Sequence, residues 1–493
     1  MATALTIDLG TTNLKVGLIN DEGEILQLRS EAVPVESPSS GAAEHNPETL
    51  KRLILDLCKE VLSNKEVDYI VSSAYQFGLM LLDGDKKPLT GLTLLTDIRS
   101  QSTYDKFLET YADRDLYAKT GCPLMSTYSL ARLFYFSRER EALFRKVRYV
   151  KDSKAYLFEW LTGEFVTDIS TAAATQIYNI KQQSWDESLL DILGLSKEQF
   201  PKIKDGTAYL SPLSKDMCTE LGLKKRPQVL LGVYDGASLG IGLGGLAPEV
   251  GIINVGTSAM LRVPGEIPAF DQNANKRIQP YALNNHVFLN GGALNNAALP
   301  VNWLRNKLFD VDVQDPAILQ VKKAPPLLCL PYLTSERDSK TGPYASGVFF
   351  GLRPFHEKID LARAVLEGVA YSMRYLFEAI EENGLQINAL RMGGGGVNIS
   401  PWPQIFANIL KLPIEIPRVD QIALIGSAML AFVADGKLKD ISVLNEQMSR
   451  RSKKVYPDGE VAHIHDDRYR FFKQLRETLG PLYEEHAGLA FKE

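Results

Sequence analysis

The 493-residue sequence predicts an α/β protein composed of two related domains. Three observations support this fold class. Short apolar strands alternate with helical segments, a strand–turn–strand pattern at the N-terminus recurs near the middle of the chain, and the length exceeds what one hydrophobic core usually fills. The two turns begin at Gly10 and Gly256, half a chain length apart. Because a repeat at this spacing is typical of two domains of one architecture, we expect domains at residues 1–245 and 246–493.

The first repeat predicts a strand at residues 4–9, a turn at 10–13 and a second strand at 14–19. A further turn at 20–23 suggests a hairpin that leads into a third strand. Apolar residues then recur at helical spacing from 47 to 62, and residues 69–73 read as a short buried strand.

The second repeat places a strand at residues 252–255 before Gly256-Thr257-Ser258 and another strand after it. The glycine-rich stretch 239–248 lies between the two repeats. Glycine-rich segments are typical of turns and hinges, so we expect a domain junction there.

A third glycine-rich turn, residues 393–396, follows a predicted strand and precedes a helix that contains residues 404–410. The tail from Asp466 to His486 resembles a charged amphipathic helix. His463 and His465 precede it in a polar segment, where exposed loop residues are a better interpretation than a metal site.

Composition excludes several classes of protein. Lys and Arg total 55 against 60 Asp and Glu, a net charge of −5 that is untypical of nucleic-acid binding. The four cysteines form no close pair, which argues against a disulfide scaffold or a structural zinc site. The N-terminus lacks the features of a signal peptide and no long apolar run is present, so we expect a cytoplasmic protein without a membrane span.

Glycine-rich turns after strands are a common way to hold nucleotide phosphates, because backbone N–H groups and hydroxyls approach the phosphate oxygens closely. None of the three turns matches GxxxxGK[ST], and none matches GxGxxG with an acidic residue about 20 positions on. Each turn alone is better explained as a tight hairpin or cap. Three of them within an internal repeat favour phosphate binding.

Phosphoryl transfer also needs a carboxylate that accepts a hydroxyl proton. Asp235 follows the apolar strand 229–231 and begins a segment of small residues. Its position fits a catalytic base, and it fits an ordinary helix N-cap equally well.

The sequence resembles the FGGY family of carbohydrate kinases over essentially the whole chain, to about residue 437. The residues that resemble family motifs are Asp8 to Lys15, Asn254 to Ser258, Gly393 to Gly396 with Trp402 and Gln404, Gly351 to Tyr371, and Thr120 to Pro123 with Leu161 to Glu164, Thr167-Asp168 and Trp185-Asp186.

The resemblance implies two ribonuclease-H-like (actin-like ATPase) domains around a central cleft, with ATP and Mg²⁺ as cofactors. The N-terminal domain would hold the sugar and the first phosphate motif, and the C-terminal domain would hold the nucleotide and end in the helical tail. Asp235 would be the catalytic base, and Asp8 and Asp235 would position Mg²⁺. The residues implied in nucleotide binding are Asp8, Gly10, Thr11, Thr12, Lys15, Gly256, Thr257, Ser258, Gly394, Gly395, Gly396 and Asn398.

The sugar side departs from the family pattern. Gln76-Phe77-Gly78 places Phe77 where many members have a histidine, and a phenyl ring cannot replace that hydrogen bond. Asp97 and Arg99 remain from an acidic-loop motif that has lost its tryptophan. With Asp235, these five residues are the implied sugar-binding set, although an Asp97–Arg99 turn contact also explains that pair.

The substrate is a separate question. Asn290 to Asn296, Asn302-Trp303 and Arg262 resemble gluconate kinases, whereas Pro331 to Leu333 with Glu336-Arg337 is shared with xylulose kinases. We therefore expect a sugar-acid kinase acting on gluconate, with xylulose or another ketose or polyol as the alternative. A non-catalytic, sugar-sensing protein of the same fold is the alternative from another class. The sequence leaves the oligomeric state open, with a homodimer as one candidate.

Overall fold

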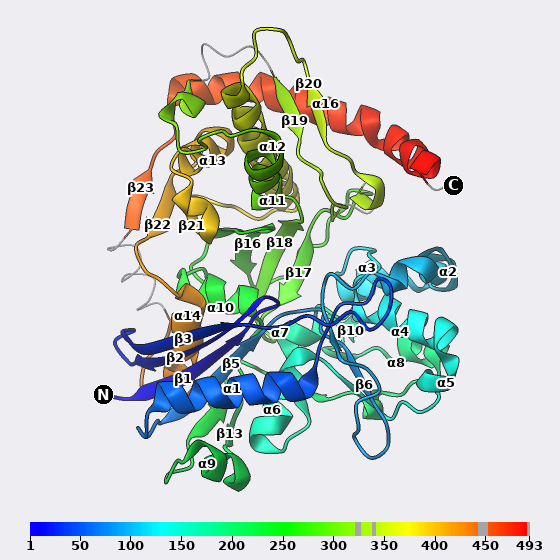
Figure 1. The fold of residues 1–493 in the computed structure, drawn as a ribbon, viewed down its shortest axis with the longest axis vertical. Coiled ribbons are helices and arrows are strands. Elements are labelled where there is room, and N and C mark those ends of the chain that lie inside the picture. Colours follow the sequence, from blue (N-terminus) through cyan, green and yellow to red (C-terminus); the bar gives the residue numbers. More distant parts are fainter. Residues whose placement is uncertain (321–326, 338–341, 442–451, 491–493) are drawn as a thin grey trace. The chain divides into compact units, whose positions relative to one another are not determined.

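The computed structural model describes residues 1–320, 327–337, 342–441 and 452–490 (Figure 1). Over these residues the chain forms two compact units. Unit 1 comprises Met1–Gly244, Tyr281–Phe288 and the described part of Asp420–Leu444. Unit 2 comprises Gly245–Pro280, the described parts of Leu289–Val419 and of Asn445–Glu493. The boundary near Gly244 falls inside the glycine-rich stretch between the two repeats.

Unit 1 is built on a six-stranded sheet in which β1, β2 and β3 form an antiparallel meander. On the other side of β1, β5 and then β14 run parallel to it. In sheet order the strands are β13 (Leu210–Pro212), β14 (Gln228–Leu230), β5 (Tyr69–Ala74), β1 (Thr3–Leu9), β2 (Asn13–Asn20) and β3 (Ile25–Ala32).

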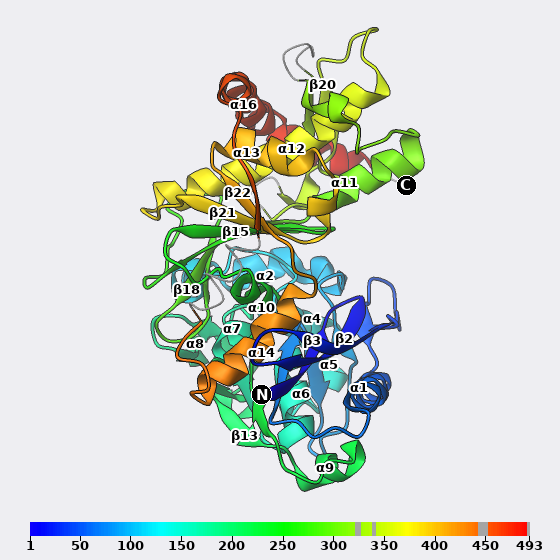
Figure 2. The same cartoon turned by 90° about the vertical axis from the view of Figure 1, so that its left-hand side faces the viewer.

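Helices cover both faces of this sheet, which explains why β5 is buried at every position. α1 (Pro47–Leu62) packs against β2 and β3, and α14 (Ile422–Ala434) packs against β1 and β5 on the opposite side (Figure 2). α1 begins where the sequence predicts, because the Asn46 side chain accepts hydrogen bonds from Glu48 N and Thr49 N and Pro47 opens the helix.

The rest of unit 1 is a set of short elements inserted between these strands. The strands are β4 (Glu44–His45), β6 (Met80–Leu82), β7 (Leu92–Thr93), β8 (Tyr149–Lys151), β9 (Val166–Asp168), β10 (Tyr178–Asn179), β11 (Ser184–Trp185) and β12 (Lys202–Lys204). The helices are α2 (Tyr104–Thr110), α3 (Leu116–Thr120), α4 (Ser129–Glu139), α5 (Glu141–Phe144), α6 (Ser153–Thr162), α7 (Ile169–Ala172), α8 (Glu187–Leu190), α9 (Lys215–Leu221) and α10 (Asp235–Gly242).

Unit 2 is built on a seven-stranded sheet of similar plan. Its strands, in sheet order, are β17 (Gln279–Ala282), β18 (Phe288–Leu294), β16 (Ala259–Gly265), β15 (Val250–Val255), β21 (Ala389–Gly393), β22 (Ile414–Pro417) and β23 (Ser452–Val455). Its other elements are α11 (Ala298–Trp303), β19 (Leu328–Leu330), β20 (Val348–Phe350), α12 (Lys358–Glu382), α13 (Trp402–Leu410) and α16 (Gly459–Ala490).

The two sheets repeat one topology. β15 pairs antiparallel with β16 and parallel with β21, as β1 pairs with β2 and β5. The next strand in each sheet, β22 or β14, is again parallel. The α/β class and the internal repeat predicted from the sequence are therefore confirmed.

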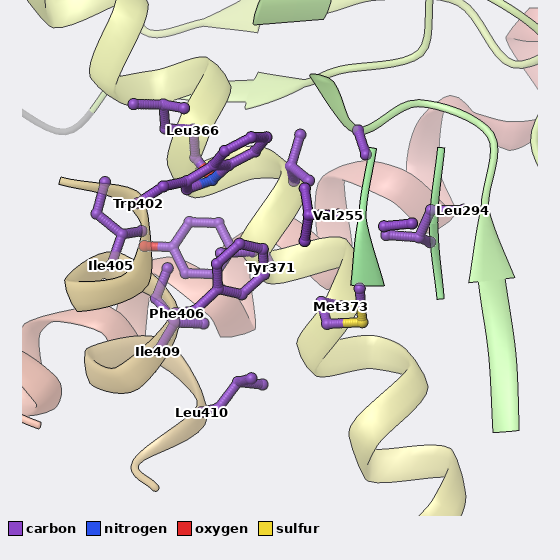
Figure 3. Packing of buried hydrophobic residues seen from close by; sticks show 14 of the residues in the cluster. Val255, Leu294, Leu366, Tyr371, Met373, Trp402, Ile405, Phe406, Ile409 and Leu410 are labelled. Carbon is purple, nitrogen blue, oxygen red and sulfur yellow. The ribbon is translucent and has the colours of Figure 1, made fainter. Parts of the chain in front are cut away.

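The core of unit 2 lies where α12 and α13 pack on the sheet (Figure 3). Trp402, which resembles a family nucleotide motif, has no exposed surface, and its Nε1 donates to Leu366 O at 3.1 Å. Its ring lies 5.7 Å from that of Phe406. Trp402 is therefore a core residue that fixes α13 against α12.

One prediction of local structure is refined and one is wrong. Residues 239–242 of the glycine-rich stretch belong to α10, whose small residues pack closely against α14, and the unit boundary follows at Gly244. The tail helix α16 begins at Gly459, so His463 and His465 are helical, not in a loop. His463 is exposed as expected, but His465 is fully buried and its Nδ1 is hydrogen-bonded to the Tyr371 hydroxyl at 2.7 Å.

All four cysteines are free, as their wide spacing predicts, and all four are buried. Among the described residues, no helix combines the length and apolar character needed to cross a membrane.

Candidate active site

Asp8 and Asp235 lie at the same edge of the unit 1 sheet. Asp8 is near the carboxyl end of β1, and Asp235 follows β14, which runs parallel to β1 through β5. Carboxyl ends of parallel strands are where α/β proteins bind ligands. Ser73, near the end of β5, is the register partner of Asp8, and its hydroxyl donates to Asp8 Oδ1 at 2.6 Å.

The protein environment makes both carboxyl groups weaker acids. Burial, followed by the negative charge of Asp8, raises the pKa of Asp235 to about 7. Burial also raises the pKa of Asp8, against the opposing effects of the Ser73 hydrogen bond and of the Lys15 charge. Both side chains keep partial solvent exposure, which a group that contacts a ligand requires.

Asp235 is the first residue of α10, and Tyr234 occupies the N-cap position. Asp235 Oδ1 accepts a hydrogen bond from the adjacent Gly236 N at 2.7 Å. The structure therefore does not show the ordinary N-cap that the sequence left open. The position still places the carboxylate at the positive end of the helix dipole, where a negative charge is stabilised.

The turn at Gly10–Asn13 projects from the same edge. Gly10 N donates to Asn13 O at 3.0 Å, and a Cβ on Gly10 would lie 2.9 Å from that oxygen, so glycine is needed here. Thr11 and Thr12 are exposed, and Lys15 is the register partner of Asp8 on β2. His45 supports the turn from behind, since its Nε2 lies 3.2 Å from Thr11 O.

Unit 2 has the corresponding turn between β15 and β16. Gly256 N donates to Ser258 O at 2.8 Å, and Thr257 and Ser258 are exposed. The carbonyl oxygens of Gly256 and Thr257 accept hydrogen bonds from Ala298 N and Ala297 N. The turn is therefore fixed to the first residues of α11, with its two hydroxyl-bearing residues facing outward.

Within unit 2 the third glycine-rich turn lies next to the second, because β15 and β21 are parallel and Asn254 is the register partner of Gly393. Gly394 has a φ of 85°, and a Cβ there would lie 2.4 Å from Asn254 Oδ1. Gly395 has open space around it, and Asn398 is exposed at the end of a 3₁₀ turn. The predicted nucleotide-binding residues of unit 2 thus form one cluster.

The predicted sugar-side residues of unit 1 are held by buried polar contacts. Gln76 Nε2 donates to Ser170 O at 3.2 Å. Phe77 has a φ of 66°, is buried, and packs edge-on against Tyr128. The buried guanidinium of Arg132 in α4 donates to Phe77 O and to Leu94 O, so one side chain joins the two sugar-side loops.

Asp97 and Arg99 form a direct ion pair, with Arg99 Nε 3.0 Å from Asp97 Oδ2. Arg99 also pairs with Glu44, and Asp97 is 1% exposed. The turn contact that the sequence left open is therefore present. A sugar-binding role for this pair stays a prediction.

The sequence pattern did not identify three buried polar residues around the site: Ser73 beside Asp8, Arg132 between the sugar-side loops, and Lys154. Lys154 had a detectable signal, because it shares one helical face with the apolar Phe158 and Leu161. A lysine at a core position of an amphipathic helix indicates a buried charge with a specific partner.

Family comparison agrees with this geometry. The model of the FGGY family of carbohydrate kinases, N-terminal domain, matches residues 3–242, and the C-terminal domain model matches residues 251–434. The chain belongs to the FGGY family of carbohydrate kinases. The predicted family and enzyme class are thereby confirmed.

Individual relatives have similar fold and length. The chain is 27% identical to a gluconokinase of Bacillus subtilis, with 90% of each chain covered. It is 28% identical to a xylulose kinase of Escherichia coli, with 97% of this chain and 98% of that one covered. The crystal structure of gluconate kinase from Lactobacillus acidophilus superposes with a TM-score of 0.91 at 28% identity, covering 98% of this chain and all of that one. The ribonuclease-H-like, two-domain fold expected from the resemblance is confirmed, whereas the sugar is not decided.

Proposed function

We propose that this carbohydrate kinase transfers the γ-phosphoryl group of ATP to a hydroxyl of a small sugar acid, with gluconate as the substrate. The observation that carries the proposal is the Asp8–Asp235 pair at the carboxyl edge of the unit 1 sheet. One member, Asp235, has a pKa raised to about 7. A general base is most effective when its pKa lies near the working pH.

In the proposed reaction Asp235 orients the acceptor hydroxyl and takes its proton. The hydroxyl oxygen forms a bond to the γ-phosphorus as the bond from that phosphorus to the β-phosphate oxygen breaks, and ADP leaves. Such transfers gain most of their rate from positioning and from electrostatic stabilisation of the phosphoryl oxygens.

The turn residues are proposed to hold the phosphates. Backbone N–H groups at Gly10–Thr12, and separately at Gly256–Ser258, are suited to phosphate oxygens, and the exposed threonine hydroxyls add donors. The Gly394–Gly396 turn with Asn398 is proposed for the nucleoside side. Lys15 would add a positive charge near the first turn.

The donor set fits Mg²⁺. Asp8 and Asp235 present carboxylate oxygens, the ligands this ion prefers, and Mg²⁺ usually combines one or two carboxylates with water and substrate phosphates. Among the described residues, no group of three or more His, Cys, Asp or Glu side chains is arranged to hold a metal ion. When bound, Mg²⁺ supplies positive charge to the phosphate oxygens. Asp8 would hold it, with Ser73 fixing the orientation of the carboxylate.

Gluconate is proposed because the Asn290–Asn296 stretch and Arg262 resemble gluconate kinases and because a gluconokinase is among the relatives. In the structure, residues of these motifs form hydrogen bonds within unit 2. Arg262 is buried and donates to Gly292 O, and Asn295 N donates to Glu336 Oε1 at 2.7 Å. Xylulose is the second candidate, since the xylulose kinase relative is equally similar.

ADP release with gluconate, xylulose and glycerol as acceptors, in the presence of ATP and Mg²⁺, tests the proposal. We expect turnover to be highest with gluconate.

The Asp235→Asn variant removes the proton acceptor, so we expect kcat to fall by about 1,000-fold or more while ATP binding, measured by calorimetry, stays near that of the wild type.

Asp68→Asn is the matched control. Asp68 precedes β5 at the opposite edge of the same sheet, where it accepts from Thr3 N at 2.9 Å, so its loss leaves turnover intact. A higher kcat/KM for xylulose than for gluconate would show that xylulose is the better substrate, and the assignment as a sugar kinase would stand. ATP hydrolysis that no acceptor stimulates, or no turnover at all, would favour the non-catalytic, sugar-sensing alternative.

A further inference from the structure

Lys154 is a fully buried lysine in unit 1 that the proposed chemistry does not use. It lies in the first turn of α6 and is 0% exposed. Burial lowers its pKa to about 8, while the charges of Asp168, Asp152, Asp235 and Asp8 oppose that effect. Burying an ammonium group is costly unless it is hydrogen-bonded, so the partners of Lys154 show what it is for.

Those partners are two backbone carbonyl groups. Lys154 Nζ donates to Ser72 O in β5 and, at 3.1 Å, to Val233 O in the segment between β14 and α10. Ser72 precedes Ser73, whose hydroxyl holds Asp8, and Val233 lies two residues before Asp235. One ammonium group therefore joins β5, the strand beside Asp8, to the segment that leads into Asp235.

Lys154 binds at an irregularity in the sheet. Leu230 is the register partner of Val71, and the next bridge joins Tyr234 to Ala74, so three residues on the β14 side oppose two on β5. This extra residue is a β-bulge, a feature that re-aims the chain and leaves ladder groups unpaired. Leu231 N and Gly232 N donate away from β5, to Tyr209 O and Gly206 O.

Gly232 makes the bulge sterically feasible. Its φ is 74°, and a Cβ at this position would lie 2.1 Å from Ser72 O, the same oxygen that accepts from Lys154. Buried carbonyl groups need a partner. Lys154, on α6, donates a hydrogen bond to a carbonyl oxygen on each side of the bulge, Ser72 O and Val233 O.

A second contact fixes the same segment. Tyr234 N donates to Ser170 Oγ at 3.1 Å, and Ser170 in turn donates to the fully buried Asp168. The residues immediately before Asp235 are thus held by side chains from α6 and α7 in addition to the single bridge between Tyr234 and Ala74.

We propose that Lys154 is a positioning residue that holds the bulge before α10 and so sets the place of Asp235 relative to Asp8. The inference rests on the proposed function of Asp235. Lys154 does not touch the substrate. It acts through the backbone at Ser72 and Val233, and its loss lets the start of α10 move away from the reactive geometry.

Lys154→Met tests this, with Lys151→Met as the matched control. Lys151 is also buried, three residues away, but it pairs with Glu159 at 2.5 Å and contacts neither side of the bulge. We expect Lys154→Met to lower kcat by about 100-fold with little change in the KM for ATP, since a small misplacement of a catalytic group has an effect of that size. Lys151→Met should lose stability to urea but keep kcat.

Amide hydrogen exchange followed by mass spectrometry gives a readout that needs no turnover. Peptides covering residues 72–75 and 231–236 should exchange faster in Lys154→Met than in Lys151→Met, with α1 unchanged in both. If those peptides keep wild-type protection, or if the two variants lose kcat equally, the positioning role is overturned.

Chemical rescue separates positioning from a general loss of stability. Lys154→Ala leaves a cavity that a small ligand can occupy, and added propylammonium should restore part of kcat without raising the unfolding midpoint in proportion. No rescue together with unchanged exchange overturns the role. If the wild type phosphorylates no acceptor, the proposed function fails, and the exchange comparison still decides whether Lys154 holds the bulge.

Discussion

His465 shows how one buried ionisable residue couples the stability of unit 2 to pH. It has no exposed surface, and its ring lies against that of Tyr371 with the hydroxyl hydrogen-bonded to Nδ1. Burial, together with the positive charges of Arg468 and Arg374, lowers the pKa of His465 from 6.5 to about 3. The imidazole is therefore neutral in the folded protein at any pH near neutrality.

The sign of the effect follows from proton binding. Between pH 6.5 and 3 the unfolded chain binds a proton at this histidine and the folded chain does not, so acid favours unfolding. At pH 5 the free energy of unfolding should be about 2 kcal/mol lower, relative to pH 7.5, because of this residue alone. Urea unfolding of the wild type and of His465→Gln at both pH values measures the contribution.

Glutamine keeps an acceptor for the Tyr371 hydroxyl but does not titrate. The wild type should lose about 2 kcal/mol more than His465→Gln between the two pH values, since all other groups are shared. Equal losses in the two proteins would show that His465 is protonated, or accessible, in the folded state.

At the scale of elements, the glycine-rich turns depend on close approach of backbones. Gly394 combines a φ of 85° with a position where a Cβ would lie 2.4 Å from Asn254 Oδ1 and 2.5 Å from Val255 O. Gly384 has a similar φ of 84° but no atom within 4 Å of its Cβ position. Gly394 also has a ψ of 175°, in a region essentially restricted to glycine, so an alanine there meets both backbone strain and a steric clash.

Gly384→Ala should cost about 1–2 kcal/mol of unfolding free energy, the price of a left-handed alanine. Gly394→Ala should cost about 3 kcal/mol or more, because β15 and β21 must also move apart. Urea unfolding compares the two variants. Similar losses would mean that the turn adapts to a side chain without displacing β15.

These turns were predictable from sequence, because glycine placement and apolar strands are local patterns. The positions of β1, β2, β15 and α1 follow from such patterns, and so does Asp235 at the end of a strand. The bulge before Asp235 was not predictable, because it depends on which strand lies beside β14. The two hydrogen-bond partners of Lys154 were not predictable for the same reason. Both are backbone carbonyl groups, which the spacing of side chains in the sequence does not indicate.

At the scale of the whole molecule, the two units are not two contiguous halves of the sequence, because unit 1 also takes in Tyr281–Phe288 and the segment that contains α14. α14 lies late in the chain but packs on α10, β1 and β5 of unit 1. The two helices approach closely at glycines, because a Cβ on Gly426 would lie 2.1 Å from Ser238 O and one on Gly242 would lie 2.1 Å from Ile422 O. No local signal in residues 422–434 reveals this partner.

The predicted domain at residues 1–245 can therefore be tested as a fragment. Without α14 it exposes the apolar surface that this helix covers, and α14 itself buries Leu424, Ile425, Met429, Leu430 and Phe432 among others. Burial of five large side chains contributes on the order of 10 kcal/mol, as much as the net stability of a typical domain.

We expect residues 1–245 alone to lack a cooperative urea transition. The same fragment joined to residues 420–441 through a flexible linker should unfold cooperatively, whereas a scrambled 420–441 segment should not restore the transition. The expectation would be contradicted if residues 1–245 alone unfolded cooperatively with a urea midpoint close to that of the joined fragment. The first half would then be an autonomous domain that folds without α14.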